Sequence, residues 1–440
     1  MNRELQDLAA WTIERAAEAG ADASRVRITG ERRVEIQFRD GKAQSIKEAA
    51  TRTLAIEVYA AGRYSAQSTS DLRRDALGDF IARAVVTTKL LAEDPDRSLP
   101  DPRYYEGRAQ LDLGVRDAAY EALSPEGRLD IARRLESACR ERAGEPLISA
   151  EAEEADRRVE SVVLTSNGFV GSREATYFTA GAMATVRDED DRRPNGYYYV
   201  SSVSLKGMPS AEECGRLAAE RTLEQIGGRK IATETLPVII ENSQVPRVLS
   251  GLLDAMDGSN IQQQRSFLAG KKGERIASEK LTLIDDPHVP GGLGSRLYDG
   301  DGFATRRRTM IEAGVLRDFY IDWYYGRKLG WEPTTGESTN LVIPPGTRSV
   351  AEIMQDLGRG ILITGFIGGN SNSTTGDASV GILGRLFDGG VPVHAVAEMN
   401  IAANHLELWQ KLIEVANDPW IYSSWRTPSL VLADVVVAGV

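Results

Sequence analysis

The histidines and cysteines of this chain are too few and too widely spaced to form a metal site from local sequence. The three histidines stand at positions 288, 394 and 405, and no two of them lie within six residues of each other. A helical zinc site of the peptidase kind needs two imidazoles about one turn apart on the same face. Cys139 and Cys214 form neither a C-x-x-C pair nor a zinc-binding spacing. A metal site would therefore require long-range convergence of these side chains, which the spacing does not indicate.

A glycine-flanked segment carries several hydroxyl groups that could act as nucleophiles. It reads Gly368-Gly369-Asn370-Ser371-Asn372-Ser373-Thr374-Thr375-Gly376-Asp377. A serine or threonine here becomes a nucleophile if a base reaches its hydroxyl, but such hydroxyls more often cap backbone groups of their own loop. Glycines also let the backbone approach a ligand closely, and exposed amides beside a strand can pair with an extended peptide. We therefore treat this loop as a candidate peptide-binding element.

Two further groups of residues are open to more than one interpretation. The segment Asp285-Asp286-Pro287-His288 could supply a carboxylate–imidazole acid–base pair, or it is a turn whose aspartates accept backbone hydrogen bonds. The aromatic clusters Tyr197-Tyr198-Tyr199 and Trp323-Tyr324-Tyr325 are either contact anchors for another chain or part of the chain's own packing.

Composition limits the class of protein. At 440 residues the chain should hold two domains or one large domain with a repeat, and contents of 42% hydrophobic and 27% charged residues are typical of a globular protein. Its net charge of −11 argues against a general nucleic-acid binder, because phosphate contacts require basic surface. Two unpaired cysteines, no apolar signal segment at the start and no long apolar run predict a cytoplasmic protein without a membrane span.

The first 228 residues predict the same arrangement twice. Apolar spacing predicts a helix over residues 3–19, and alternating strands follow around a hairpin at Asp40-Gly41. Ser70 is expected to cap the helix that closes this unit. The second unit is predicted as two helices that flank several strands. The predicted helices are residues 71–91, 125–143 and 210–226, and the second unit's strands are 148–154, 158–166, 169–176, 178–188 and 196–206.

From Leu236 onward the pattern changes to short strands with glycine turns. Residues 236–240 predict a buried strand, residues 244–257 an amphipathic helix, and residues 430–437 a strand central to a sheet. We therefore expect an α+β protein. Its N-terminal domain, residues 1–229, should hold two helix–antiparallel sheet–helix units, and its C-terminal domain, residues 230–440, should be rich in sheet.

Short segments of the C-terminal half resemble the TldD/PmbA family of peptide-processing proteins. In chain order they are residues 249–258, 265–268 with Ser266, 270–276 with Gly273-Glu274, 281–287 with Asp285-Asp286-Pro287, 297–302, 314–316, 335–336, Gly365, 368–377, 428–432 and Gly439. Each segment alone is weak evidence, but their order and spacing are specific as a set. The N-terminal half is consistent with the family through its helices, its hairpins and Thr165-Ser166-Asn167-Gly168.

The resemblance implies a role without a metal on this chain. In that family the TldD subunit carries zinc on an H-E-x-x-x-H helix, and the TldE (PmbA) subunit has the same fold without the metal ligands. The matching segment here, residues 248–258, contains Ser250, Asp254 and Asp257 and no histidine. The chain therefore resembles TldE, with no catalytic residue and no cofactor of its own. Zinc is expected on a TldD-type partner.

The same resemblance implies a complex that cleaves unfolded or leader peptides held in an internal channel. This chain would complete the cavity and bind peptide. The residues expected to bind peptide or line the cavity are Gly368, Gly369, Asn370, Ser371, Asn372, Ser373, Thr374, Asp254 and Ser266.

Two alternatives from other classes remain open. The chain could form a homodimer with itself as a peptide-binding or scaffold protein. It could also be a hydrolase of modified peptides or amino-acid conjugates with its own non-zinc site, in which Asp254, His288 or Ser373 would carry the activity.

Overall fold

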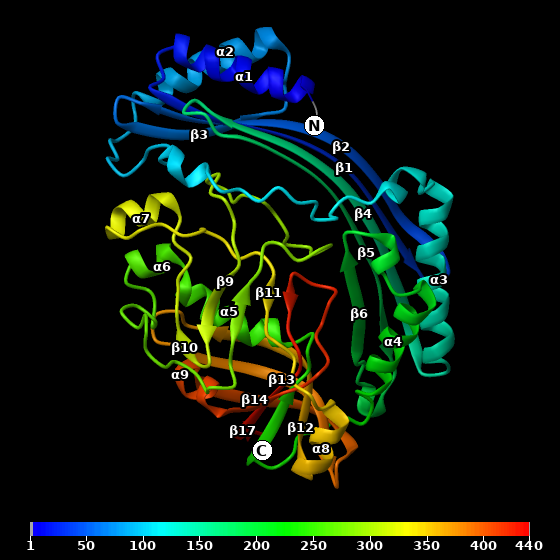
Figure 1. Ribbon diagram of the computed structural model, residues 1–440. Coiled ribbons are helices and arrows are strands. Elements are labelled where there is room, and N and C mark those ends of the chain that lie inside the picture. The colour runs from blue at the N-terminus through cyan, green and yellow to red at the C-terminus, as the bar shows by residue number, and fades with distance from the viewer. Residues whose placement is uncertain (1–2, 440) are drawn as a thin grey trace.

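A single long, curved antiparallel sheet forms the N-terminal part of the computed structural model, which describes residues 3–439 (Figure 1). Its strands lie in the order β3-β2-β1-β4-β5-β6. They are β1 (Ala23–Arg39), β2 (Lys42–Ala60), β3 (Arg63–Thr69), β4 (Leu147–Thr165), β5 (Val170–Val186) and β6 (Asn195–Ser202). Asp40 and Gly41 make the turn between β1 and β2, both with positive φ, as this short hairpin requires.

Two helices close each half of this sheet. Helices α1 (Arg3–Glu18) and α2 (Arg74–Thr88) pack on the β1–β3 half, and α3 (Pro125–Ala143) and α4 (Ala211–Leu223) pack on the β4–β6 half. The chain thus repeats helix, three antiparallel strands, helix, and the two units join edge to edge where β1 pairs with β4. The predicted α+β class with two helix–sheet–helix units is confirmed.

The predicted interruptions of the second unit's strands are wrong. Residues 148–154 and 158–166 belong to the one strand β4, and residues 169–176 and 178–188 fall on the one strand β5. The polar middle of β4 does not break it, because Asp156 is buried in an ion pair with Arg128 of α3. The second helix is also shorter than predicted, since it begins after Arg73 rather than at a cap formed by Ser70.

A connecting segment with two short 3-10 turns, Pro102–Tyr105 and Ala118–Ala122, runs between the long sheet and the rest of the molecule. Residues of the aromatic cluster 323–325 form hydrogen bonds with the first part of this segment, which follows α2. The Tyr324 hydroxyl donates to Asp94 Oδ2 at 2.8 Å, and Trp323 Nε1 donates to Ser98 Oγ at 3.0 Å. These aromatic residues therefore serve contacts within the chain, whereas Tyr197 and Tyr199 are exposed.

The C-terminal part is built on a second sheet, in the order β14-β13-β12-β7-β17-β15. Since β14 also pairs with β17, through Asn400↔Ala438 and Ile401↔Val437, five of these strands close into a small barrel. The strands are β7 (Glu234–Ile240), β12 (Arg359–Ser371), β13 (Asp377–Asp388), β14 (Val391–Asn404), β15 (Leu412–Val415) and β17 (Leu430–Ala438). Leucine, isoleucine and valine side chains from these strands fill the main hydrophobic core.

Short elements surround this barrel. Helices α5 (Val245–Met256) and α9 (His405–Leu408) lie at one end of it. A small sheet in the order β10-β9-β8-β11-β16 lies towards the N-terminal sheet. The remaining elements are α6 (Gly258–Gln262), α7 (Trp323–Leu329), α8 (Val350–Leu357), β8 (Leu283–Asp285), β9 (Arg308–Glu312), β10 (Val315–Leu316), β11 (Leu341–Val342) and β16 (Trp425–Arg426).

Contacts cross between the two parts of the chain. Arg25 of β1 forms an ion pair with Asp301, and Arg385 of β13 forms one with Glu224 beyond α4. The division into residues 1–229 and 230–440 stays a prediction. Among residues 3–439, no helix has both the length and the apolar character needed to cross a bilayer.

Candidate site at the end of the C-terminal barrel

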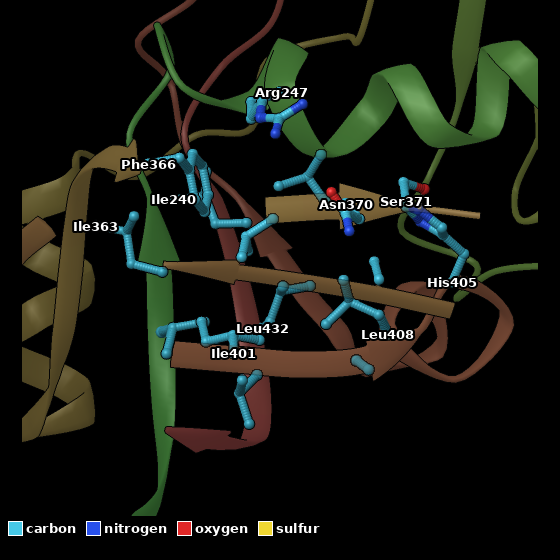
Figure 2. Close-up of a pocket in the computed structure, with 16 residues that line it drawn as sticks. Ile240, Arg247, Ile363, Phe366, Asn370, Ser371, Ile401, His405, Leu408 and Leu432 are labelled. Carbon is cyan, nitrogen blue, oxygen red and sulfur yellow. Dashed lines mark hydrogen bonds between the residues drawn. The ribbon is translucent and has the colours of Figure 1, made fainter. Parts of the chain in front are cut away.

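Helix α5 lies across one end of the barrel and covers a small cavity. Its buried face carries Val245, Leu249 and Leu252, Asp254 is exposed to solvent, and the largely exposed Arg247 lies at the rim of the cavity. The cavity measures about 40 Å³ and is lined mainly by aliphatic side chains of all five barrel strands. A space of this size holds a few water molecules or the end of one side chain. Its polar residues are Arg247, Asn370, Ser371 and His405. Figure 2 shows Asn370, Ser371 and His405 together at one end and Arg247 nearer Phe366.

Ser371 and His405 form a hydrogen-bonded pair at this end (Figure 2). The Ser371 Oγ and His405 Nε2 atoms are 2.9 Å apart. The imidazole is only 2% exposed, and its ring stacks on Phe267 with the centroids 5.7 Å apart. Burial lowers the pKa of His405, so the ring is neutral at pH 7. A neutral imidazole that contacts a hydroxyl through Nε2 can accept its proton.

The other ring nitrogen of His405 has no orienting partner. Nδ1 is buried and makes no hydrogen bond within residues 3–439. In serine hydrolases a carboxylate normally holds this atom and stabilises the imidazolium. The pair therefore has the nucleophile and the base of such a site but lacks the third group.

A glycine of α5 makes room for this pair. A Cβ atom on Gly251 would lie 2.2 Å from His405 Nε2 and 2.9 Å from Ser371 Oγ. Distances this short do not occur in real structures, so the helix approaches His405 closely only because residue 251 has no side chain.

The glycine loop is shaped by its own hydrogen bonds and by α5. Gly368 and Gly369 both have positive φ, 58° and 92°, and form a bulge between β12 and β13. The Arg247 guanidinium donates to the carbonyl oxygens of both glycines, at 2.9 and 3.3 Å. Asn372 closes the turn, because its Oδ1 accepts from the Thr374 amide at 2.9 Å. The loop is thus held by Arg247 of α5 on one side and by a local cap within its turn on the other.

The predicted site residues do not all meet in one place. Asn370 and Ser371 line the cavity, Gly368 and Gly369 contact Arg247 beside it, and Ser373 accepts from the Phe267 amide through its carbonyl oxygen. Asn372 and Thr374 lie in the exposed turn. Asp254 lies on the solvent side of α5, and Ser266 uses its hydroxyl to donate to the Ala255 carbonyl and to accept from the Leu268 amide.

Sequence reasoning missed three residues of this site: Arg247, Gly251 and His405. The partners Ser371 and His405 are 34 residues apart and meet because β13 and β14 run side by side between them. No local spacing signals that contact. The segment from Asp285 to His288 forms the predicted turn, since Asp286 Oδ1 accepts from the His288 amide at 3.0 Å.

The donor groups near α5 do not suit a zinc ion. Ser250 donates its hydroxyl to the Arg247 carbonyl at 3.0 Å, and His405 Nε2 is engaged by Ser371. Within residues 3–439, no three histidine, cysteine, aspartate or glutamate side chains gather closely enough to hold a metal ion. A tetrahedral zinc site needs three or four such ligands.

Comparison with known proteins places the chain among peptidase relatives. Residues 119–226 match the central domain of the PmbA/TldA metallopeptidases, and residues 233–439 match their C-terminal domain. The chain is 25% identical to metalloprotease PmbA of Escherichia coli O157:H7, over 99% of this chain and 97% of that protein.

Two crystal structures extend this likeness to the whole fold. A Bacteroides thetaiotaomicron protein, described as a candidate modulator of DNA gyrase, is 35% identical with a TM-score of 0.96, and the match covers 100% of both chains. TldE from Thermococcus kodakarensis is 22% identical with a TM-score of 0.87, over 98% of this chain and 100% of that one, which shows a shared fold.

Proposed function

The chain belongs to the PmbA/TldD metallopeptidase family, and from this premise we propose that it is a TldE-like subunit that carries no catalytic metal of its own. It would bind peptide and complete the cavity of a complex whose zinc is held by a TldD-type homologue. Its substrates would be unfolded or leader peptides.

The observation that carries this proposal is the environment of α5. The family is a metallopeptidase family, yet the residues that α5 and its neighbours present do not fit zinc. Gly251 leaves no side chain on the helix where it meets His405, and that imidazole is buried and bonded to Ser371. Asp254 is a single exposed carboxylate. We therefore assign hydrolysis to a partner chain and derive no catalytic step through a metal here.

An unpaired edge of strand β2 supports the proposal that this chain binds peptide. Within the described chain, β3 pairs only with the second half of β2, so residues 42–53 of β2 have a hydrogen-bonding partner on one side alone. These residues are exposed, and an extended peptide or a partner's strand can add to such an edge through its backbone. Strand addition tolerates varied sequences, which suits a peptide-processing complex.

Two buried, unpaired thiols, Cys139 and Cys214, support our proposal of a cytoplasmic location, where thiols stay reduced.

Reconstitution tests the proposal. This chain should be purified alone, and also together with a zinc-carrying homologue from the same genome. We expect the mixture to elute as one complex and to cleave an unfolded peptide, while the chain alone contains no stoichiometric zinc and is inactive. A chelator added to the mixture should abolish cleavage. Stoichiometric zinc on the isolated chain would contradict the proposal.

One specific observation favours a second candidate function. Ser371 Oγ and His405 Nε2 are 2.9 Å apart, which is the distance expected between a nucleophile and its base. We therefore also propose, as an alternative, that the chain is a hydrolase with its own site. A fluorophosphonate probe should then label Ser371 in the isolated chain, and Ser371→Ala should abolish the label. Labelling that persists in Ser371→Ala, or no labelling at all, rules this function out.

A further inference from the structure

A second cavity, polar and much larger, lies between the concave face of the N-terminal sheet and the C-terminal part. It measures about 340 Å³. Strands β1, β4 and β5 form one wall, residues 296–300 with Glu337 form another, and residues 111–113 and 115 of the connecting segment also line the cavity. Neither the glycine loop nor α5 reaches it. The cavity is distinguished by its arginines, Arg27, Arg173 and Arg296.

Strand register places two of these arginines on the same wall. Arg27 of β1 stands opposite Val163 of β4, and Ser161 of β4 stands opposite Arg173 of β5. Val163 and Ser161 are two residues apart and share a face of the sheet, so both arginines project from that face. Two strand spacings and a two-residue offset put their Cα atoms about 12 Å apart, which lets two extended guanidinium groups close on one small group. The opposite face of β1 is buried under α1 and α2.

These two guanidinium groups lack anionic partners. Among residues 3–439, no acidic side chain lies within 4.0 Å of a charged nitrogen of Arg27 or Arg173. Arg173 donates one bond, to the Tyr177 hydroxyl at 2.7 Å, and its Nε is buried without an acceptor. Arg296 also has a buried Nε without an acceptor. A buried donor without a partner is costly, and an acceptor atom on a bound ligand would satisfy it.

Four acidic residues line the cavity, and each accepts hydrogen bonds from other residues of the chain. Glu174 accepts from Arg116 at 2.8 Å and from Arg158 at 3.0 Å. Glu337 forms an ion pair with Arg296 at 3.2 Å. Asp299 is buried and accepts from the backbone amides of residues 301 and 303. Asp112, on the connecting segment, accepts from the Gly114 amide at 2.9 Å. None of these four carboxylates forms an ion pair with Arg27 or Arg173 among residues 3–439.

An aromatic hydroxyl lies beside the two arginines. The ring of Tyr298 packs onto β5 at Gly171, where a Cβ atom would be 2.6 Å from Tyr298 Cζ. Gly171 stands in the same row across the sheet as Val163 and Arg27. The absence of a side chain at Gly171 thus brings the Tyr298 hydroxyl, a hydrogen-bond donor, to the arginine wall.

We propose that this cavity binds an oxyanion, a carboxylate or a phosphate group, between the guanidinium groups of Arg27 and Arg173 with the Tyr298 hydroxyl as a further donor. Planar guanidinium groups bind both anions in bidentate fashion. The volume admits a group of a few heavy atoms together with water. The cavity is separate from the barrel end. The proposed anion binding does not depend on whether the chain works with a zinc-carrying partner.

Calorimetric titration of the isolated full chain tests the site at constant ionic strength. The probes are inorganic phosphate and an N-acetylated, C-amidated tripeptide with central glutamate, the latter compared with its glutamine counterpart. Binding of phosphate alone identifies a phosphate ligand, and binding of the glutamate peptide but not the glutamine peptide identifies a carboxylate ligand. Either result supports the proposal, and binding of neither probe overturns it.

Variants then locate the binding. The double variant Arg27→Met with Arg173→Met should lower the affinity for the probe about tenfold or more, because methionine cannot make the charge-assisted hydrogen bonds of the two guanidinium groups. Arg83→Met, at an exposed arginine of α2, is the matched control and should leave the affinity unchanged. Equal affinity in the double variant would overturn the assignment. If the double variant does not fold, phenylglyoxal modification of the wild-type chain replaces it: the probe should slow modification of Arg27 and Arg173 and leave Arg83 unaffected, and equal rates would overturn the proposal.

Discussion

Gly251 of α5 and His405 of α9 are in such close contact that a single added carbon at residue 251 would lie 2.2 Å from the imidazole Nε2. This contact seats α5 on the barrel end and holds the Ser371–His405 pair beneath it. The helix position and the imidazole position therefore depend on each other.

Gly251→Ala should destabilise the protein although alanine is the better helix former. The new methyl group has to displace His405 or α5, and overpacking of this kind costs about 1–3 kcal/mol. Urea unfolding measures the change. Gly78→Ala in α2 is the matched control, because no atom lies within 4 Å of the Cβ it adds, and it should stabilise the protein by about 0.5–1 kcal/mol. A Gly251→Ala variant as stable as Gly78→Ala would show that the contact is not tight.

The stability of the protein should fall on acidification in part because of His405. Burial lowers the pKa of folded His405 below its ordinary value of 6.5, so the unfolded chain binds this proton more readily. The contribution is complete above pH 6.5 and is lost as the pH falls through the lowered pKa. The free energy of unfolding, measured with urea between pH 5 and 7.5, should depend less steeply on pH in His405→Gln than in the wild type. His394→Gln, at a half-buried histidine away from the barrel end, serves as the control, and equal slopes in all three proteins would contradict the prediction.

The ionisation of Asp299 should make the protein less stable as the pH rises, which is opposite to the effect of His405. Burial, and then the neighbouring charge of Asp301, raise the pKa of Asp299 from 3.8 to about 7. The folded chain therefore holds this proton more tightly, and the contribution is complete below pH 3.8 and is lost as the pH rises to about 7. Asp299→Asn should remove that decline in the unfolding free energy measured from pH 4 to 8. Asp79→Asn, on the exposed side of α2, should reproduce the wild-type curve.

The buried Arg128–Asp156 pair should be much more important for stability than an exposed pair. Their side chains are 2% and 0% exposed, and Arg128 Nη2 donates to Asp156 Oδ1 at 3.1 Å. Arg128→Met leaves a buried carboxylate without its partner, which costs about 3–5 kcal/mol. Arg103→Met removes the exposed pair with Glu332 and should cost at most about 1 kcal/mol. Chemical denaturation of the two variants measures the loss in unfolding free energy of each. Similar losses in both variants would contradict the role of burial.

The fold was largely predictable because its elements follow local periodicity. Apolar spacing over residues 3–19 matches the helix Arg3–Glu18, the start signal at Ser124 and Pro125 matches the helix Pro125–Ala143, and the Asp40-Gly41 signal marks a real hairpin. The misplaced breaks in β4 have a tertiary cause. A charged residue in mid-strand suggests an interruption, and only the approach of Arg128 from α3 lets Asp156 stay buried in a continuous strand.

The sequence by itself indicated the family that the chain joins and the absence of a locally spaced metal-binding motif. Three scattered histidines and two isolated cysteines exclude a metal site of local spacing. The glycine loop, together with the other segments in their order along the chain, indicates the PmbA/TldD family. Only the tertiary structure decided which polar groups meet. Strand pairing brings Ser371 to His405, and it places Arg27 and Arg173 on the same wall of the second cavity. Periodicity specifies elements and their faces over a few residues, whereas convergence depends on pairing between distant strands, and no local spacing records it.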